Sequence, residues 1–417
     1  MPAPIPLELQ EQVLDHLLDD TTTLKQCSFV CRAWTPRTRS YLFRKFSAHY
    51  RSPNDCTPRC RPYVEHFLYL AVYVREIEIQ DSADAIFLTR KHPAHTKPAF
   101  GDSELLALCS IFDHLVSLRK ITVSSKCGDV IRDRYWPHVS AKFRTSLEAV
   151  FNKFSSSLTH ILMYGFFFDV SHVRMFRGLD SLQYLGLEAI CAENESTGLV
   201  PFQADDSLSF GSIQTLSLNF HTAELDPVNG LLLTRLVNTL RISNLRHLRL
   251  GGANDVSILE ALPLSWSSTV VHFALELTIL NPTIPWSPLS PTFTAKLPEF
   301  RALRVLELSL NIEPLESHHL NALKDFMNAM LPPSRRLDEL IVTIAAVEEV
   351  PVDSSAVSTL YEFCLSRAEV VRIQWEDGKL DILGDRFPDL FATGAMKIGH
   401  FLQDHWFAGI STVPDFH

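Results

Sequence analysis

Four metal-ligating side chains lie close together near the start of the chain: His49, Cys56, Cys60 and His66. Thiolate and imidazole groups are the ligands that zinc prefers in proteins. The gap between the two cysteines suits a zinc site only loosely, and the helical finger that usually follows such a pair is missing. Prolines surround the cysteines, which is typical of a connecting segment. We therefore expect a linker here, and we predict no metal and no cofactor.

A second candidate for chemistry is a nucleophilic serine. Residues 100–105 read Phe-Gly-Asp-Ser-Glu-Leu, which resembles the nucleophile block of GDSL-type hydrolases with Ser103 as the nucleophile. Asp169-x-x-His172 supplies an Asp-x-x-His sequence as well. In that family the nucleophile follows a buried apolar strand and the histidine lies near the end of the domain. Here Lys-Pro-Ala precedes the serine segment, so the resemblance stops at the short motif.

Both segments have a simpler interpretation as helix starts. Asp and Ser accept hydrogen bonds from the free amide groups at the beginning of a helix. We therefore expect Asp102 or Ser103 to cap a helix that begins at Glu104, and Asp169 or Ser171 to cap the next one. No Gly-rich phosphate loop follows a predicted strand in this sequence. We predict that the protein is not an enzyme by itself.

The composition indicates a folded protein that does not bind nucleic acid. Of 417 residues, 46% are hydrophobic and 21% are charged, which is close to the ordinary globular mix. The net charge of −10 is opposite in sign to that of a general phosphate binder. The first residues show no signal-peptide pattern, and no apolar run is long enough for a membrane span. These observations predict an intracellular protein, in the cytoplasm, the nucleus or both.

The elements that would position any site begin with a small helical unit. Residues 5–46 predict three short helices, because apolar residues recur at helical spacing in Leu9, Val13 and Leu17 and again after a break at residues 19–21. Either Thr21 or Thr22 is expected to cap the second helix. A unit of this size buries little surface by itself and usually needs a partner.

The motif carried by these helices is Ile5-Pro6-x-Glu8-Leu9, then Val13-Leu14-x-x-Leu17, then Leu24-x-x-Cys27-Ser28-x-Val30-Cys31-Arg32-x-Trp34. It resembles the F-box motif across nearly its full length. The resemblance implies that this unit docks on a Skp-type adaptor. By motif position, the adaptor-binding residues would be Ile5, Pro6, Glu8, Leu9, Leu24, Val30, Cys31 and Trp34. For Leu14 and Leu17 we expect burial in the unit's own core.

A second pattern follows, with apolar residues at the first, fourth and sixth places of a six-residue segment, as in Leu303-x-x-Leu306-x-Leu308. The alternation at its end predicts a strand with one buried face. Helical stretches are expected between copies, at residues 104–117, 230–242, 316–331 and 353–366. Ten copies begin at Val74, Leu118, Leu158, Leu182, Ile213, Leu245, Val270, Leu303, Leu337 and Val370.

Strand, loop and helix at a repeated spacing are typical of a solenoid. The copies resemble the degenerate leucine-rich repeats of fungal F-box proteins, although their spacing is longer and less even than in regular repeats. The predicted fold is α/β: a small three-helix F-box followed by an irregular leucine-rich-repeat-like α/β solenoid. The expected ranges are 1–50 for the F-box, 51–70 for a linker or helical connection, 71–377 for the solenoid and 378–417 for a C-terminal cap.

The resemblance implies a substrate-receptor subunit of an SCF-type cullin-RING ubiquitin ligase, which holds a protein substrate near the conjugating enzyme. The alternative is an F-box scaffold that binds the adaptor without presenting substrates. The sequence names no substrate, and it leaves open whether phosphorylation controls recognition and whether the protein forms oligomers.

Substrate is expected to bind the polar faces of the repeat strands. The exposed strand positions carry the acids Glu76, Glu78, Glu188, Glu276, Glu307, Glu339 and Glu376 and the bases Lys120, Arg249 and Arg372. This excess of acids predicts a preference for a basic substrate segment. The candidate substrate-binding residues are His160, Tyr184, His247, Arg249, His272, Glu307 and Glu339.

Overall fold

The structure is a computed structural model. It describes residues 6–18, 20–50, 59–81, 99–125, 136, 139–166, 170–190, 210–220, 236–237, 240–253, 262–279, 299–312, 324, 327–328, 330–331, 335–345, 362–375 and 396–398. The chain divides into two compact units, Met1–Ile213 and Gln214–His417. Each unit contains a parallel β-sheet, and helices accompany the strands. The predicted mixed α/β class is confirmed.

The first unit begins with the three predicted helices, α1 (Leu7–Asp15), α2 (Thr21–Cys27) and α3 (Thr35–Leu42). We call these helices and the turns between them the helical module. The cap of α2 differs from the prediction: the backbone N–H of Thr23 donates to Asp20 Oδ1 at 2.9 Å, and Thr21 is already helical. A carboxylate is favoured there because it also interacts with the positive end of the helix dipole.

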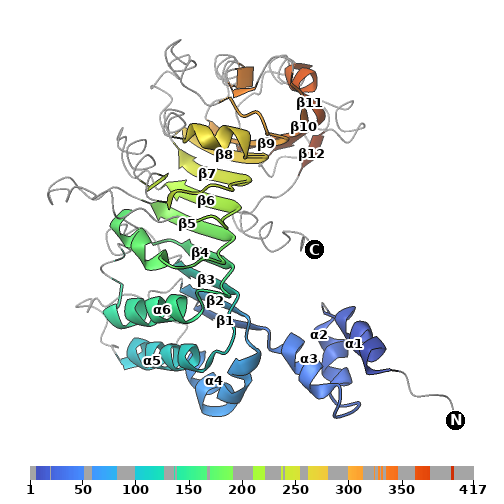
Figure 1. The fold of residues 1–417 in the computed structure, drawn as a ribbon, viewed down its shortest axis with the longest axis vertical. Helices are drawn as coiled ribbons and strands as arrows, with labels where there is room; N and C mark the ends of the chain where they lie inside the picture. Colours follow the sequence, from blue (N-terminus) through green and yellow to red (C-terminus); the bar gives the residue numbers. More distant parts are fainter. Residues whose placement is uncertain are drawn as a thin grey trace. The chain divides into compact units, whose positions relative to one another are not determined.

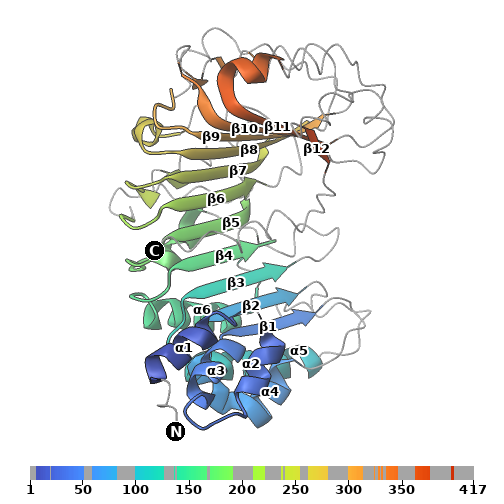
Figure 2. The ribbon, with the colours of Figure 1, turned by 90° about the vertical axis from the view of Figure 1, so that its right-hand side faces the viewer.

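A parallel sheet follows in the first unit, and its strands lie side by side in chain order (Figures 1 and 2). Along the strands, buried apolar residues alternate with more exposed polar ones, as in β2 with Ile77 and Ile79 buried. The sheet therefore presents one apolar and one largely polar face. The strands are β1 (Lys45–Tyr50), β2 (Glu76–Asp81), β3 (Lys120–Ser125), β4 (His160–Tyr164) and β5 (Tyr184–Ile190).

Helices connect these strands, as parallel pairing requires. Figures 1 and 2 show α5 and α6 on the same side of the sheet. They bury large apolar residues there, including Phe112 of α5 and Phe143 of α6. The sequence had not predicted α6. The connecting helices are α4 (Cys60–Phe67), η1 (Leu68–Tyr73), α5 (Ala99–His114), α6 (Ala141–Lys153) and η4 (Val170–Phe176).

The predicted cap of α5 is wrong. The helix begins at Ala99, five residues before the expected start, so Asp102 and Ser103 lie inside it. The second predicted cap was Asp169 or Ser171. Ser171 lies within η4 instead of preceding a helix, and Asp169 falls outside the described residues.

Glu104 of α5 is fully buried, and its carboxylate is surrounded by donors from the start of α4. The backbone N–H groups of Arg59 and Cys60 donate to Oε2 at 2.9 and 2.8 Å, and that of Arg61 donates to Oε1 at 3.2 Å. The Tyr50 hydroxyl at the end of β1 donates to Oε2. Glu104 therefore caps α4 from a distant part of the sequence and joins β1, α4 and α5.

The second unit repeats the arrangement of parallel strands in chain order (Figure 2). The one described strand in the range of the predicted C-terminal cap, β12, pairs with β11 and extends this sheet. The elements are β6 (Thr215–Phe220), β7 (His247–Ala253), η7 (Leu264–Ser268), β8 (His272–Ile279), β9 (Val305–Ile312), β10 (Leu337–Ala345), β11 (Ala368–Trp375) and β12 (Met396–Ile398).

The six-residue pattern predicts the strands well, with one correction of register. In the first eight copies the strand begins two residues after the first apolar residue, and those first residues are buried. In the last copy Leu337 pairs with Ala368, so the copy begins at Ala368 and not at Val370. Val370 is exposed, whereas Val371 is buried. The sequence Ala368-x-x-Val371-x-Ile373 fits the pattern less obviously because its first residue is alanine.

The sheet also begins earlier than expected. β1 lies within residues 1–50, the range predicted for the F-box, and it pairs in parallel with β2. The Arg44 carbonyl accepts hydrogen bonds from the N–H groups of Arg75 and Glu76, so the ladder starts two residues after α3 ends. The predicted linker, residues 51–70, contains α4 and the start of η1.

Several predicted segments fall largely outside the described residues. Of the predicted helices at 230–242, 316–331 and 353–366, only residues 236–237, 240, 324, 327–328, 330 and 362–366 are described as helical. Residues 376–395 and 399–417, which make up most of the predicted cap and include Glu376, are likewise not described.

Candidate interaction surfaces

The core of the helical module is very small. Among the described residues, its buried apolar side chains are Leu14, Leu24 and Cys27, and Leu17, Trp34, Tyr41 and Leu42 pack against them partly exposed. The expected burial of Leu14 is thus observed, and Leu17 is partly buried in the same cluster. Three fully packed side chains contribute only several kcal/mol of burial energy, at about 1.5–3 kcal/mol each. The module consequently depends on additional interactions.

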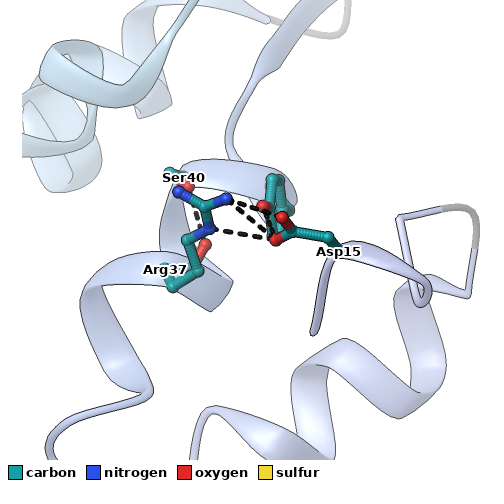
Figure 3. A network of polar contacts seen from close by, with 4 residues as sticks. Asp15, Arg37 and Ser40 are labelled. Atoms are coloured by element: carbon teal, nitrogen blue, oxygen red, sulfur yellow. Dashed lines mark hydrogen bonds and ion pairs between the residues drawn. The ribbon is translucent and has the colours of Figure 1, made fainter. Parts of the chain in front are cut away.

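Polar contacts between α1 and α3 supply part of that stabilisation (Figure 3). Arg37 Nε and Nη2 donate to Asp15 at 3.1 and 2.9 Å, and the Tyr41 hydroxyl donates to the same carboxylate. These contacts, the Tyr41 hydrogen bond first, hold the pKa of Asp15 below its usual range. Burial and the hydrogen bond to Asp15 raise the pKa of Tyr41 to about 12. The Arg37 guanidinium also lies 5.2 Å from the Tyr41 ring centroid.

The surface of the module carries large apolar side chains without cover from the described chain. The exposed fractions are 51% for Leu9, 55% for Val13, 87% for Phe29 and 65% for Val30. Leu9 and Val13 are four residues apart on α1 and therefore share one face of that helix. Exposed apolar groups concentrated on so small a unit are typical of an interaction site.

Most residues predicted to bind the adaptor lie at this surface. Pro6, Glu8 and Cys31 are exposed, as are Leu9 and Val30. Ile5 lies outside the described residues.

Two of the predicted residues have other roles in this structure. Leu24 is fully buried in the core, so its placement on a docking surface is not supported. Trp34 is partly buried, and its Nε1–H donates to Gln10 Oε1 at 2.6 Å. Leu24 therefore stabilises the module, whereas Trp34 joins α1 to α3 and leaves part of its ring accessible.

Two groups of the predicted substrate-binding residues are brought together, one in each unit. In the first unit, His160 of β4 pairs in register with Tyr184 of β5, and their rings stack with centroids 5.8 Å apart. Gly186 next to them leaves room for Tyr184 and for Leu162, since a Cβ there would lie 2.5 Å from Leu162 Cδ1. The result is an aromatic and apolar area on an otherwise polar strand face.

In the second unit, His247, His272 and Glu307 form a contiguous group on β7, β8 and β9. The two imidazole rings are 5.7 Å apart, and His272 Nε2 lies 3.2 Å from Glu307 Oε1. Burial, together with His272 and Arg246, lowers the pKa of His247. Burial would raise the pKa of Glu307, but the contact with His272 and the charge of Arg249 outweigh it and lower that pKa.

The acids on the strand faces are largely matched by bases. Arg44 Nε lies 2.8 Å from Glu76, and Lys45 Nζ lies 2.5 Å from Glu78. In the second unit, Arg372 Nε lies 2.7 Å from Glu339 Oε1. These pairs, together with His272 and Glu307, reduce the negative potential that a count of acidic residues suggests. The predicted preference for a basic substrate segment stays a prediction with weaker electrostatic support.

Sequence reasoning missed two features of these surfaces. Phe29 occupies a variable place of the recognised motif, and its exposure becomes evident only once the turn after α2 is built. The strand β1 was missed although Phe43-x-x-Phe46-x-Ala48 fits the six-residue pattern, because alanine is a weak apolar signal. As a result, Lys45 and the neighbouring His49, which flank Glu78, were absent from the predicted face.

Of the residues considered for metal binding, Cys56 lies outside the described residues. Cys60 is buried against Tyr50, and burial raises the pKa of its thiol to about 12. Within the described ranges, no group of three or more His, Cys, Asp or Glu side chains is arranged to hold a metal ion. Among the same residues, no helix is both long and apolar enough to cross a membrane.

Comparison with known proteins gives no independent identification. No protein-family model matches the chain, and no curated protein matches it significantly in sequence.

Proposed function

We propose that this protein is a substrate-receptor subunit of an SCF-type cullin-RING ubiquitin ligase, with an F-box in its helical module and a leucine-rich-repeat-like solenoid in its parallel sheets. The module binds a Skp-type adaptor, and the polar strand faces bind a protein substrate. The receptor contributes orientation and local concentration to ubiquitin transfer, and no catalytic side chain is assigned to it.

One observation supports this proposal most directly. Two residues of the motif that resembles an F-box, Leu9 and Val30, are exposed, while the apolar core of the module contains three buried side chains among the described residues. A unit with this balance gains stability when a partner covers its apolar surface. The resemblance supplies the identity of the partner, and the exposure supplies the reason for binding.

Co-expression with a Skp-type adaptor tests the proposal. The wild-type chain is expected to elute with the adaptor as a 1:1 complex in size-exclusion chromatography, and a Leu9→Glu, Val30→Glu double variant is expected to lose it. These residues are better probes than Trp34, whose hydrogen bond to Gln10 makes its replacement a structural change. The matched control is Val116→Glu, Leu264→Glu, which charges two equally exposed apolar residues outside the module.

The ligase role needs a second readout. Cullin that co-purifies with the complex supports a ubiquitin-ligase receptor, whereas adaptor without cullin supports the scaffold alternative. A wild-type chain that is folded and does not bind the adaptor would overturn the proposed function.

A further inference from the structure

The turn between α2 and α3 displays the most exposed large apolar side chain among the described residues. Phe29 is 87% exposed, and its neighbour Val30 is 65% exposed. The turn is nevertheless well ordered by backbone hydrogen bonds: the N–H of Phe29 donates to Gln26 O at 3.0 Å and that of Val30 to Cys27 O at 3.1 Å. An aromatic ring held on a hydrogen-bonded turn loses little conformational entropy when it binds.

The charged residues of the chain segment that contains this turn are all of one sign. Residues 21–45 contain six Lys or Arg and no Asp or Glu. Three of the six are engaged, Arg37 with Asp15, Arg44 with Glu76 and Lys45 with Glu78.

Exposed basic groups remain on both sides of Phe29 in the chain. Lys25 precedes it by four residues and Arg32 follows it by three, and both are exposed. Neither makes an ion pair with another residue in the described part of the chain.

The opposite charge gathers on α1. Glu8 and Glu11 lie on the same helix as Leu9, and α1 contains no Lys or Arg. The module is therefore electrostatically polarised along the chain: α1 carries acids together with Leu9 and Val13, and the segment that contains Phe29 and Val30 carries bases. A partner that matches both ends can bind in only one orientation, because the reverse orientation would place like charges together.

From these observations we infer that Phe29 is the principal anchor for the adaptor and that it enters an apolar pocket bordered by acidic residues of that partner. Lys25 and Arg32 steer the encounter and fix its orientation, and Phe29 supplies most of the contact energy. The inference rests on the proposed function, and it adds a residue outside the recognised motif and the chemistry of the surface that receives it.

Binding measurements on the full-length chain with a purified Skp-type adaptor test this inference. Phe29→Ala is expected to weaken binding by about 30-fold or more, as is typical for a hot-spot aromatic residue. Lys25→Glu with Arg32→Glu is expected to weaken it by about tenfold, mainly through slower association. Raising the salt concentration should weaken wild-type binding more than binding of the double variant.

Matched controls separate these effects from general changes. Val116→Ala removes a similarly exposed apolar side chain, and Lys142→Glu reverses an exposed charge on α6; neither should change the affinity. All replaced residues are exposed, so the melting temperature should stay within a few degrees of the wild-type value, and the charge variant provides a second test if Phe29→Ala is poorly folded.

The outcomes distinguish the two proposals. Wild-type binding with unchanged affinity in Phe29→Ala and in the charge variant would overturn this inference and leave the adaptor-binding role intact. A folded wild-type chain without affinity for the adaptor would overturn both. Loss on Phe29→Ala together with a reduced salt dependence of the charge variant would establish both the anchor and its acidic receptor.

Discussion

The helical module and the parallel sheets differ in how many apolar side chains they leave exposed. The module leaves Phe29, Val30, Leu9 and Val13 exposed, and among its described residues the apolar core contains three buried side chains. Among the strand residues whose side chains are described, the sheets bury most apolar positions and pair several of their exposed acids with bases on neighbouring strands. The module is therefore the region whose stability should change most on binding, and the sheet is the region that should be stable by itself.

The largest expected effect is on the stability of the parallel sheet in the first unit. Glu104→Ala leaves three backbone amides and the Tyr50 hydroxyl without their buried acceptor. Each such loss costs about 1–3 kcal/mol, so we expect destabilisation of at least about 4 kcal/mol. Chemical denaturation and amide exchange at residues 59–61 measure it. Glu148→Ala, at an exposed position of α6, is the control, and equal stability of the two variants would contradict the assigned role.

A somewhat smaller effect is expected in the module itself. Leu24→Ala removes one of its three fully packed side chains and should cost about 3 kcal/mol. Because the module has little else to hold it, amide protection should fall throughout residues 7–42 while β9 keeps its protection. Added adaptor should restore the protection through mass action. Loss of protection in both regions would contradict the independence of the module.

The accuracy of the sequence-based predictions also differs between parts of the molecule. Strands were predicted correctly where a buried leucine or isoleucine marks each alternate position, as in β9, and they were missed or misplaced where alanine takes that position, as at Ala48 and Ala368. The buried contacts of Glu104 could not be predicted, because its partners are distant in the sequence. The surface role of a motif residue also depends on packing, which separates buried Leu24 from exposed Val30.

The Asp15 network predicts a pH dependence that is confined to the module. The pKa of Asp15 is lowered in the folded state, so its contribution to stability is fully present above the unfolded value of about 4 and is lost as the pH falls through the lower folded value. Exchange protection of α1 and α3 should therefore decrease below about pH 4 in the wild-type chain. The Asp15→Asn variant should lack this acid-dependent step. A wild-type profile identical to that of the variant would exclude the carboxylate as its cause.

The smallest effect is expected at the paired charges of the strand face. Glu339→Gln removes the ion pair with Arg372, whose two side chains are both partly exposed, and should change the free energy of unfolding by less than about 1 kcal/mol. The same substitution together with Glu307→Gln tests the predicted preference for basic segments, since it lowers the negative charge of the face. It should weaken the binding of a basic partner, and the weakening should be largest at low ionic strength. Loss of several kcal/mol of stability would instead mean that these charges hold the sheet together, which would remove the contrast between a self-sufficient sheet and a partner-dependent module.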